Sequence, residues 1–275
     1  MDEQLQRRVQ RYGWDRAAEY YERYWRKQLE PAHEELLDMI ALQPGDRVLD
    51  AACGSGWVTF QMAEQVGLKG TVLGTDISDN MIELARRLAG EKKVTNATFE
   101  RMDAEGLKVS AGAFDAATCA LGLMYVPDVR KALAGFFAAL RPGGRAAAAV
   151  WGARSRCGWA EIFPIVESKI TSEVCPLFFQ LGSGATLETA FHDSGFINLR
   201  SMRISTELIY KSGEDACGAA FAGGPVALAY SRFDAKTREV AEVEYLQSIE
   251  HYLDGSTYRV PGEFVITVGA KPMSQ

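Results

Sequence analysis

The chain has 275 residues, of which 47% are hydrophobic and 24% charged, which is typical of a soluble globular protein. Its net charge of −6 argues against nucleic acid as the main partner, because phosphate binding requires a basic face. The five cysteines show neither C-x-x-C spacing nor neighbouring histidines, so neither a metal site nor a disulfide framework is indicated. No apolar stretch is long enough to span a bilayer, and the polar N-terminus does not resemble a signal peptide. We therefore expect a cytoplasmic protein.

The first part of the chain is predicted to be helical, with one helix over residues 4–30, an interruption at Pro31 and a second helix over 32–42. From residue 43 onward, strands and helices alternate. Strands are expected at 47–49, 71–74, 97–101, 114–121 and 145–151, and helices at 57–66, 79–90 and 129–140. This alternation predicts a parallel sheet with right-handed crossovers.

The pattern changes after residue 151. Helices are expected at 158–183, at 187–192 and, with a break at 222–225, over 213–254, and strands at 196–209 and 264–269. We accordingly divide the chain into an N-terminal helical lid segment, a core, and a remainder of the same domain that carries helical insertions and the last two strands. The boundaries are 1–42, 43–151 and 152–275, with the insertions at 152–196 and 209–263.

Residues 48–59 carry the most informative pattern. A buried strand ends at Asp50, and Gly54 and Gly56 form a turn before the next helix. Glycine can take a positive φ and lets the backbone approach a ligand, and such a turn holds an adenosyl group at the carboxyl ends of parallel strands. A dinucleotide fingerprint requires a third glycine where Thr59 stands, and the Asp50 carboxylate would repel a pyrophosphate but favour an ammonium group. The pattern therefore indicates a phosphate-free nucleoside that carries an amino acid.

The segment Asp50-Ala51-Ala52-Cys53-Gly54-Ser55-Gly56 resembles the first motif of the class I S-adenosylmethionine-dependent methyltransferases, with alanine at 52 where the family usually has glycine. The segments 72–78, 102–104, 114–121 and 140–144 resemble further motifs in the family's order. The resemblance implies an α/β fold: a Rossmann-like, seven-stranded, mostly parallel sheet with an antiparallel last strand, helices on both faces and helical lid insertions. Residues 122–128 are similar to the small-molecule branch that includes the ubiquinone and menaquinone biosynthesis methyltransferases (type 11).

The resemblance also implies the residues that hold S-adenosylmethionine. Asp50 would meet the amino group, Asp76 the ribose hydroxyls and Asp103 the adenine amino group. Each of these aspartates also has a purely structural interpretation, as a turn, helix-cap or loop residue. The expected cofactor-binding set is Asp50, Ala51, Gly54, Gly56, Asp76, Ile77, Met81, Asp103, Ala104 and Cys119.

No essential base is identifiable from the sequence. Tyr21 on the first helix is a candidate for a catalytic contact to the sulfonium or the acceptor, although packing of that helix on the domain is the simpler explanation. His251, on the second insertion, is the other candidate. His33 and His192 are expected on solvated helix faces.

These observations predict methyl transfer from S-adenosylmethionine to a small apolar or aromatic molecule, with S-adenosylhomocysteine as the product. The insertions would roof the acceptor pocket with six aromatic residues, which could instead form their own core: Phe163, Phe178, Phe179, Phe221, Tyr230 and Tyr245. Three alternatives stay open: a nicotinamide-dependent dehydrogenase, a non-catalytic S-adenosylmethionine-binding protein, and a methyltransferase that acts on a macromolecule.

Overall fold

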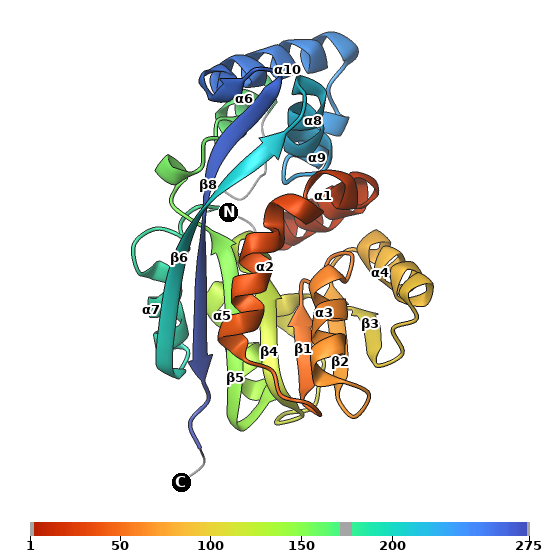
Figure 1. Ribbon diagram of the computed structural model, residues 1–275, viewed down its shortest axis with the longest axis vertical. Helices are drawn as coiled ribbons and strands as arrows, with labels where there is room; N and C mark the ends of the chain where they lie inside the picture. The colour runs from red at the N-terminus through yellow and green to blue at the C-terminus, as the bar shows by residue number, and fades with distance from the viewer. Residues whose placement is uncertain (1–2, 171–177, 274–275) are drawn as a thin grey trace.

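The computed structural model describes residues 3–170 and 178–273, and its centre is one mixed sheet (Figure 1). The sheet order is β3-β2-β1-β4-β5-β8-β6. β1 to β5 are parallel, whereas β8 is antiparallel to both β5 and β6. The strands are β1 (Arg47–Ala51), β2 (Thr71–Asp76), β3 (Ala97–Arg101), β4 (Phe114–Ala120), β5 (Leu140–Trp151), β6 (Ile197–Tyr210), the two-residue β7 (Leu253–Asp254) and β8 (Thr257–Ala270). The predicted fold class and the antiparallel last strand are confirmed.

Helices cover both faces of this sheet. In Figure 1, α2 and α3 lie on the near face and α5 on the far face, where it contacts α7. The helices are α1 (Glu3–Tyr24), α2 (Arg26–Ile40), α3 (Trp57–Val66), α4 (Asp79–Lys92), α5 (Val129–Ala139), α6 (Ile162–Lys169), α7 (Thr186–Asp193), α8 (Gly213–Cys217), α9 (Ala227–Ser231) and α10 (Ala235–Ile249). No helix within the described ranges is long and apolar enough to cross a membrane.

The middle of the sheet is built from small side chains. Residues 146–149 of β5 are four alanines, all fully buried, although alanine has a low strand propensity. Both α2 and α5 contact β5. Tertiary packing therefore determines this strand, because close covering from two sides favours short side chains.

The predicted interruption at Pro31 is wrong. The first two helices separate at Trp25, and Pro31 lies inside α2. Pro31 lies past the first turn of α2, where proline costs a backbone hydrogen bond and crowds the preceding turn, so burial of the neighbouring Leu29 and Ala32 keeps this segment helical. The chain instead turns where the Trp25 indole is buried and donates from Nε1 to the Ala219 carbonyl at 3.1 Å.

The C-terminal part departs further from the sequence prediction. Within the predicted helix 158–183, only α6 forms in the described part, and residues 171–177 lie outside the described residues. The helical stretch after β6 is divided by a π-helical turn (Gly218–Ala222) between α8 and α9. β8 begins at Thr257 rather than at residue 264, so the end of the predicted insertion 209–263 is strand. This extension was missed because Pro261 interrupts the pattern. In the described part of the chain, β8 pairs at Pro261 with β6 and not with β5, so the missing N–H breaks no central ladder.

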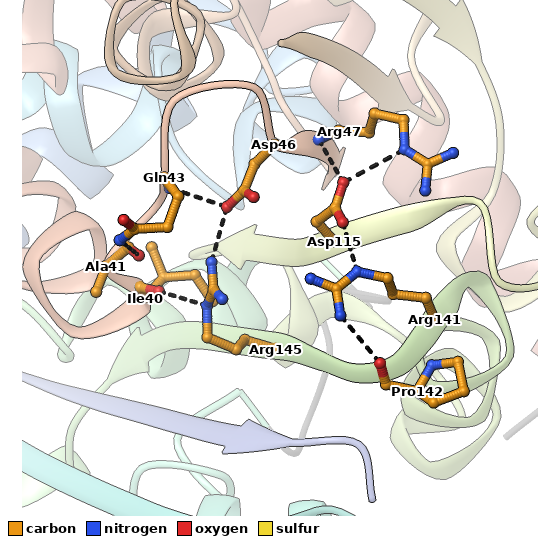
Figure 2. Close-up of polar contacts among 9 residues, drawn as sticks. All are labelled: Ile40, Ala41, Gln43, Asp46, Arg47, Asp115, Arg141, Pro142 and Arg145. Carbon is orange, nitrogen blue, oxygen red and sulfur yellow. Dashed lines mark hydrogen bonds and ion pairs between the residues drawn. The ribbon is translucent and has the colours of Figure 1, made fainter. Parts of the chain in front are cut away.

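A charged network closes the end of the sheet where the parallel strands begin (Figure 2). Asp115 accepts hydrogen bonds from the Arg47 backbone N–H at 2.8 Å and from Arg141 Nε at 2.5 Å. Asp46 accepts from Arg145 Nη2 at 2.7 Å. Burial of Asp115 favours its protonation, but the hydrogen bonds from the two arginines outweigh burial and lower its pKa. The network joins the starts of β1, β4 and β5, so it contributes to the stability of the sheet.

Candidate functional site

A cleft of about 720 Å³ lies at the opposite end of the sheet, where β1, β2, β3 and β4 finish. Such a position is the usual ligand site of an open α/β sheet. Helix α1 forms one wall, and the loops that follow the four strands form the others. The lining residues are Arg7, Gln10, Trp14 and Tyr21 from α1; Ala52 and Gly54 after β1; Asp76, Ile77 and Met81; Met102, Asp103 and Ala104; and Ala120, Leu121, Gly122, Tyr125, Val126 and Pro127.

The glycine loop after β1 turns through a left-handed backbone at several positions. Gly54 has φ 54°, Gly56 has φ 84°, and Ala52 has φ 56° despite its Cβ. The Ala52 methyl group lies against Gly122: a Cβ added to Gly122 would stand 2.4 Å from it. The two small residues therefore fit each other across the mouth of the cleft, and a larger residue at 122 would not.

Asp76, at the end of β2, organises this loop. One carboxylate oxygen accepts the Gly54 N–H at 2.9 Å and the other accepts the Ser78 N–H at 2.9 Å. The side chain is buried, and burial raises the pKa of Asp76 to about 6, with the two backbone hydrogen bonds opposing the shift. Asp76 thus presents a buried carboxylate to the cleft with only amide donors around it, and each oxygen can accept a further hydrogen bond.

Asp50 lies beneath the glycine loop rather than in the cleft. Its carboxylate accepts from Thr59 Oγ1 at 2.6 Å and from Thr118 Oγ1 at 3.1 Å, and it is almost fully buried. Burial raises the pKa of Asp50 to about 6 against these two hydrogen bonds. Thr59, which takes the place of the third glycine in a dinucleotide fingerprint, therefore holds the carboxylate at the base of the loop.

Six of the ten residues expected to bind cofactor line the cleft, namely Gly54, Asp76, Ile77, Met81, Asp103 and Ala104. The other four lie behind its wall. Asp50, Ala51 and Cys119 are buried, and Gly56 is the N-cap of α3. A Cβ at Gly56 would approach the Phe60 and Phe99 rings to about 3 Å, so packing alone requires glycine there.

Helix α1 closes over the cleft through polar contacts to three loops. Arg7 Nε donates to Glu105 Oε2 at 2.6 Å, and Arg11 Nη2 lies 2.5 Å from Asp79 Oδ2. The Ser78 hydroxyl donates to Asp15 Oδ1 at 2.6 Å, and the Ser55 hydroxyl donates to Glu22. Three of the four α1 residues that face the cleft, Arg7, Gln10 and Trp14, were not predicted from the sequence. Their spacing with Ala17 and Tyr21, alternately three and four residues, was a detectable signal of one helix face.

A second, smaller cavity adjoins the cleft; we call it the aromatic chamber. It shares Trp14, Tyr21, Leu121 and Tyr125 with the cleft. Its other lining residues are Trp25, Leu29, Met124, Trp151, Trp159, Gly224 and Pro225. The rings of Trp14 and Tyr21 meet edge to face, with centroids 5.8 Å apart, and form part of the boundary between the cavities. Burial, followed by the charge of Glu22, raises the pKa of Tyr21 far above its ordinary value, so its hydroxyl stays protonated.

The six aromatic residues expected to roof the acceptor line neither cavity. Phe163 and Phe178 pack together with centroids 5.1 Å apart, and Phe221 and Tyr230 do so at 4.9 Å. These rings form the core of the insertions. The chamber is instead lined by aromatic residues of α1, of the junction between α1 and α2, of the segments after β4 and β5, and of the end of β5, such as Trp25 and Tyr125.

The positions of His251 and His33 differ from those expected from the sequence. His251 is exposed, stacks on Tyr252 with centroids 3.8 Å apart, and lines neither cavity. The expectation that His33 is solvated is wrong: it is buried on the inner face of α2, and burial lowers its pKa to about 4. Within the described ranges, no three histidine, cysteine or acidic side chains come together as a metal site.

Comparison with known proteins identifies the core. Residues 48–144 match a family model described as a methyltransferase domain. This chain contains a class I methyltransferase domain. The class uses S-adenosylmethionine, and the matched residues include the glycine loop and Asp76.

Two curated relatives of this methyltransferase domain have names that specify a small-molecule substrate. Aklanonic acid methyltransferase DauC of Streptomyces sp. (strain C5) is 36% identical over 49% of this chain and 61% of its own length. Demethylmenaquinone methyltransferase of Lactococcus lactis subsp. lactis is 40% identical over 37% of this chain and 40% of its own length. The chain thus spans about half the length of the curated relatives it matches.

Solved structures show the same fold at low identity. A putative methyltransferase from Bacillus halodurans superposes with a TM-score of 0.61 and 17% identity, covering 88% of this chain and 99% of that one. The [4+2]-cyclase SpnF superposes with a TM-score of 0.58 and 16% identity, and the match covers 91% of this chain and 83% of that one. The fold of this methyltransferase domain therefore also occurs in a protein with a different named activity.

Proposed function

We propose that this protein transfers a methyl group from S-adenosylmethionine to a small apolar or aromatic molecule. The observation that carries the proposal is the buried Asp76 carboxylate at the floor of a cleft that adjoins an aromatic chamber. The relatives named for aklanonic acid and demethylmenaquinone support a small-molecule acceptor. Transfer to a macromolecule is less well supported, because the chamber is small and α1 covers the cleft.

The chemistry of the cleft fits S-adenosylmethionine. Among the described residues the Asp76 carboxylate has amide partners but no cationic partner, so the two ribose hydroxyls would supply the further donors it can accept. Ile77, Met81 and Ala104 offer an apolar surface for adenine, and Asp103 lies beside them to accept from an amino group. Gly54, with a positive φ, allows close approach of the methionine part to the backbone.

A dinucleotide fits the same cleft poorly. Its pyrophosphate would approach the glycine loop, beneath which Asp50 and Asp76 lie buried. The one basic side chain of the described lining, Arg7, is paired with Glu105 at 2.6 Å and with Asp103 at 3.3 Å. The negative charges therefore disfavour a nicotinamide cofactor.

The residues of the site would act mainly by positioning. Bound in the cleft, S-adenosylmethionine supplies a methyl group on a positively charged sulfur, and S-adenosylhomocysteine is the product. Holding an acceptor in line with that group is worth about 7–11 kcal/mol of the barrier. The aromatic walls and the covering α1 would exclude water. The protonated Tyr21 hydroxyl cannot serve as a base. Tyr21 would instead donate a hydrogen bond, or the face of its ring would contact the positively charged sulfur.

The proposal is tested by incubating the protein with methyl-labelled S-adenosylmethionine and a protein-free small-molecule extract of cells, and in parallel with the macromolecular fraction. We expect label in an organic-soluble product, formed in step with S-adenosylhomocysteine. Label only in protein or RNA would contradict the acceptor class. Tight binding of S-adenosylmethionine without release of S-adenosylhomocysteine from any fraction would favour the non-catalytic alternative.

A further inference from the structure

Gln10, on the face of α1 that lines the cleft, has a polar side chain without a partner in the described part of the chain. The residue is only 6% exposed. Neither atom of its amide is among the fully enclosed, unpartnered atoms of the described side chains, so both still reach accessible space. A mostly buried amide without a hydrogen bond is costly, so its place on the cleft wall indicates a polar group of a ligand.

The contacts of α1 on either side of Gln10 place it over the loops that follow β2 and β3. Arg7 Nε, one turn earlier, lies 3.3 Å from Asp103 Oδ2 in the loop after β3. Arg11 Nη2, the next residue along, lies 2.5 Å from Asp79 Oδ2 at the start of α4, after β2. Gln10 therefore faces the part of the cleft that lies between these two loops.

The same two loops carry the residues that we propose for adenine. Ile77 and Ala104 supply the apolar surface, and Asp103 lies beside them to accept from the amino group. An ionised carboxylate can accept hydrogen bonds but cannot donate them, so Asp103 serves one amino hydrogen and none of the ring nitrogens. The second amino hydrogen and the ring nitrogen next to it need a different kind of group.

A carboxamide is complementary to this remaining edge. Each polar edge of adenine presents an amino donor beside a ring-nitrogen acceptor, and glutamine offers the reverse pair, an oxygen acceptor and a nitrogen donor. Glutamine reads adenine in nucleic acids through the same two bonds. Gln10 is the one carboxamide side chain in the described lining of the cleft.

We propose that Gln10 recognises one edge of the adenine of S-adenosylmethionine, with Oε1 accepting from the amino group and Nε2 donating to the adjacent ring nitrogen. Gln10 is then a specificity-determining residue for the cofactor that comes from the covering helix rather than from the sheet. The inference rests on the proposed function, because it takes the cleft as the S-adenosylmethionine site. It adds a residue of α1 to the groups that select the base.

Binding of base-modified S-adenosylhomocysteine tests this assignment without turnover. The wild type and Gln10→Leu are titrated calorimetrically with S-adenosylhomocysteine and with its 1-deaza and 7-deaza forms, each of which replaces one candidate ring nitrogen by C–H. We expect one of the two analogues to bind the wild type about fivefold more weakly than the parent compound because of Gln10, and this preference to be lost in Gln10→Leu. The analogue that shows the effect identifies the edge that Gln10 contacts.

Gln6 provides a matched control on the same helix. It is also 6% exposed, and its amide also has no hydrogen bond among the described residues, but it does not line the cleft. Gln6→Leu should therefore change neither the affinity for S-adenosylhomocysteine nor the preference over the analogues. Because Gln10→Leu could fail to fold, nitrogen-15-labelled glutamine gives a second readout: the Gln10 side-chain N–H resonances of the wild type should shift more with S-adenosylhomocysteine than with the discriminated analogue.

Preferences over both analogues that are equal in the wild type and Gln10→Leu would overturn the role of Gln10. The same loss of preference in Gln6→Leu would also overturn it, because the effect would then come from the helix and not from a contact in the cleft. These outcomes are distinct from failure of the proposed function, which would appear as absent binding of S-adenosylhomocysteine to the wild type or as absent methyl transfer.

Discussion

Asp76 holds the backbone N–H of Gly54 at 2.9 Å across a sequence separation of 22 residues. The bond joins the tip of β2 to the glycine loop after β1, so the same carboxylate that faces the cleft also fixes the backbone of the loop. A single buried group therefore links loop geometry with the proposed ribose contact, and its charge should govern both.

The affinity of the cleft for S-adenosylmethionine should depend on pH. The pKa of Asp76 is raised to about 6 by burial, and only the ionised form accepts two ribose hydroxyls. Affinity for S-adenosylmethionine should therefore fall as pH drops through 6, approaching about tenfold per pH unit. The effect on stability has the opposite sign: a raised folded pKa contributes stability below the unfolded value near 4, and this contribution is lost as pH rises through 6. Calorimetric titration between pH 5 and 8 checks the affinity, and melting curves of the free protein check the stability. An affinity for S-adenosylmethionine that does not depend on pH would contradict the ribose contact of Asp76.

His33 should make the fold sensitive to acid. Its folded pKa of about 4 lies below the unfolded value of 6.5, so stability is complete above pH 6.5 and is lost as pH falls towards 4. The difference corresponds to about 3 kcal/mol as an order of magnitude. His33→Phe should flatten the loss of melting temperature over this interval, whereas His192→Phe, at an exposed position, should leave it unchanged. An unaltered acid profile in His33→Phe would refute the buried neutral histidine.

Asp15 should control how firmly α1 covers the cleft. Its carboxylate accepts from the Ser78 hydroxyl at 2.6 Å and the Asn80 N–H at 3.3 Å. Asp15→Ala should weaken this contact by about 1 kcal/mol. Amide hydrogen exchange in α1 should then accelerate several-fold and S-adenosylmethionine should dissociate faster. Glu3→Gln, which removes an exposed ion pair at 3.3 Å, is the control and should change neither rate.

Gly122 and Ala52 should be coupled. Gly122→Ala would place a Cβ 2.4 Å from the Ala52 Cβ and 2.7 Å from Cys119 Sγ, and overpacking of this kind costs about 1–3 kcal/mol. Ala52→Gly removes the first of these clashes. In denaturant unfolding, the double variant should therefore lose less free energy of unfolding than the two single changes added together. Strict additivity would show that the two residues do not share this contact.

The sequence predicted the sheet well because its strands follow local rules. α3 and β3 begin and end where periodicity and turn residues indicate, and the caps Ser78 and Asp128 accept the N–H groups of Met81 and Lys131. The glycine loop and Asp76 were identified for a similar reason, because each lies in a short segment with a recognisable motif. The features that were not predicted from the sequence are those that depend on tertiary packing.

Three of these misses were beyond local reasoning. The turn at Trp25 depends on a carbonyl at Ala219, nearly two hundred residues away, and the extension of β8 through Pro261 depends on β6 as its only neighbour there. The burial of His33 depends on which face of α2 meets the sheet. The face of α1 that lines the cleft was predictable from its heptad-like spacing, but of its residues only Tyr21 was identified from the sequence.

The most direct test of the account is calorimetric titration of S-adenosylmethionine into the wild type and Asp76→Ala at pH 7.5. We predict that the substitution weakens binding by about 1–3 kcal/mol, the cost of leaving ligand donors unpaired. Asp115→Asn, at the other end of the same sheet, is the matched control and should lower the melting temperature while leaving the affinity unchanged. Equal affinity in the wild type and Asp76→Ala, with both variants folded, would contradict the central claim that this carboxylate binds the cofactor.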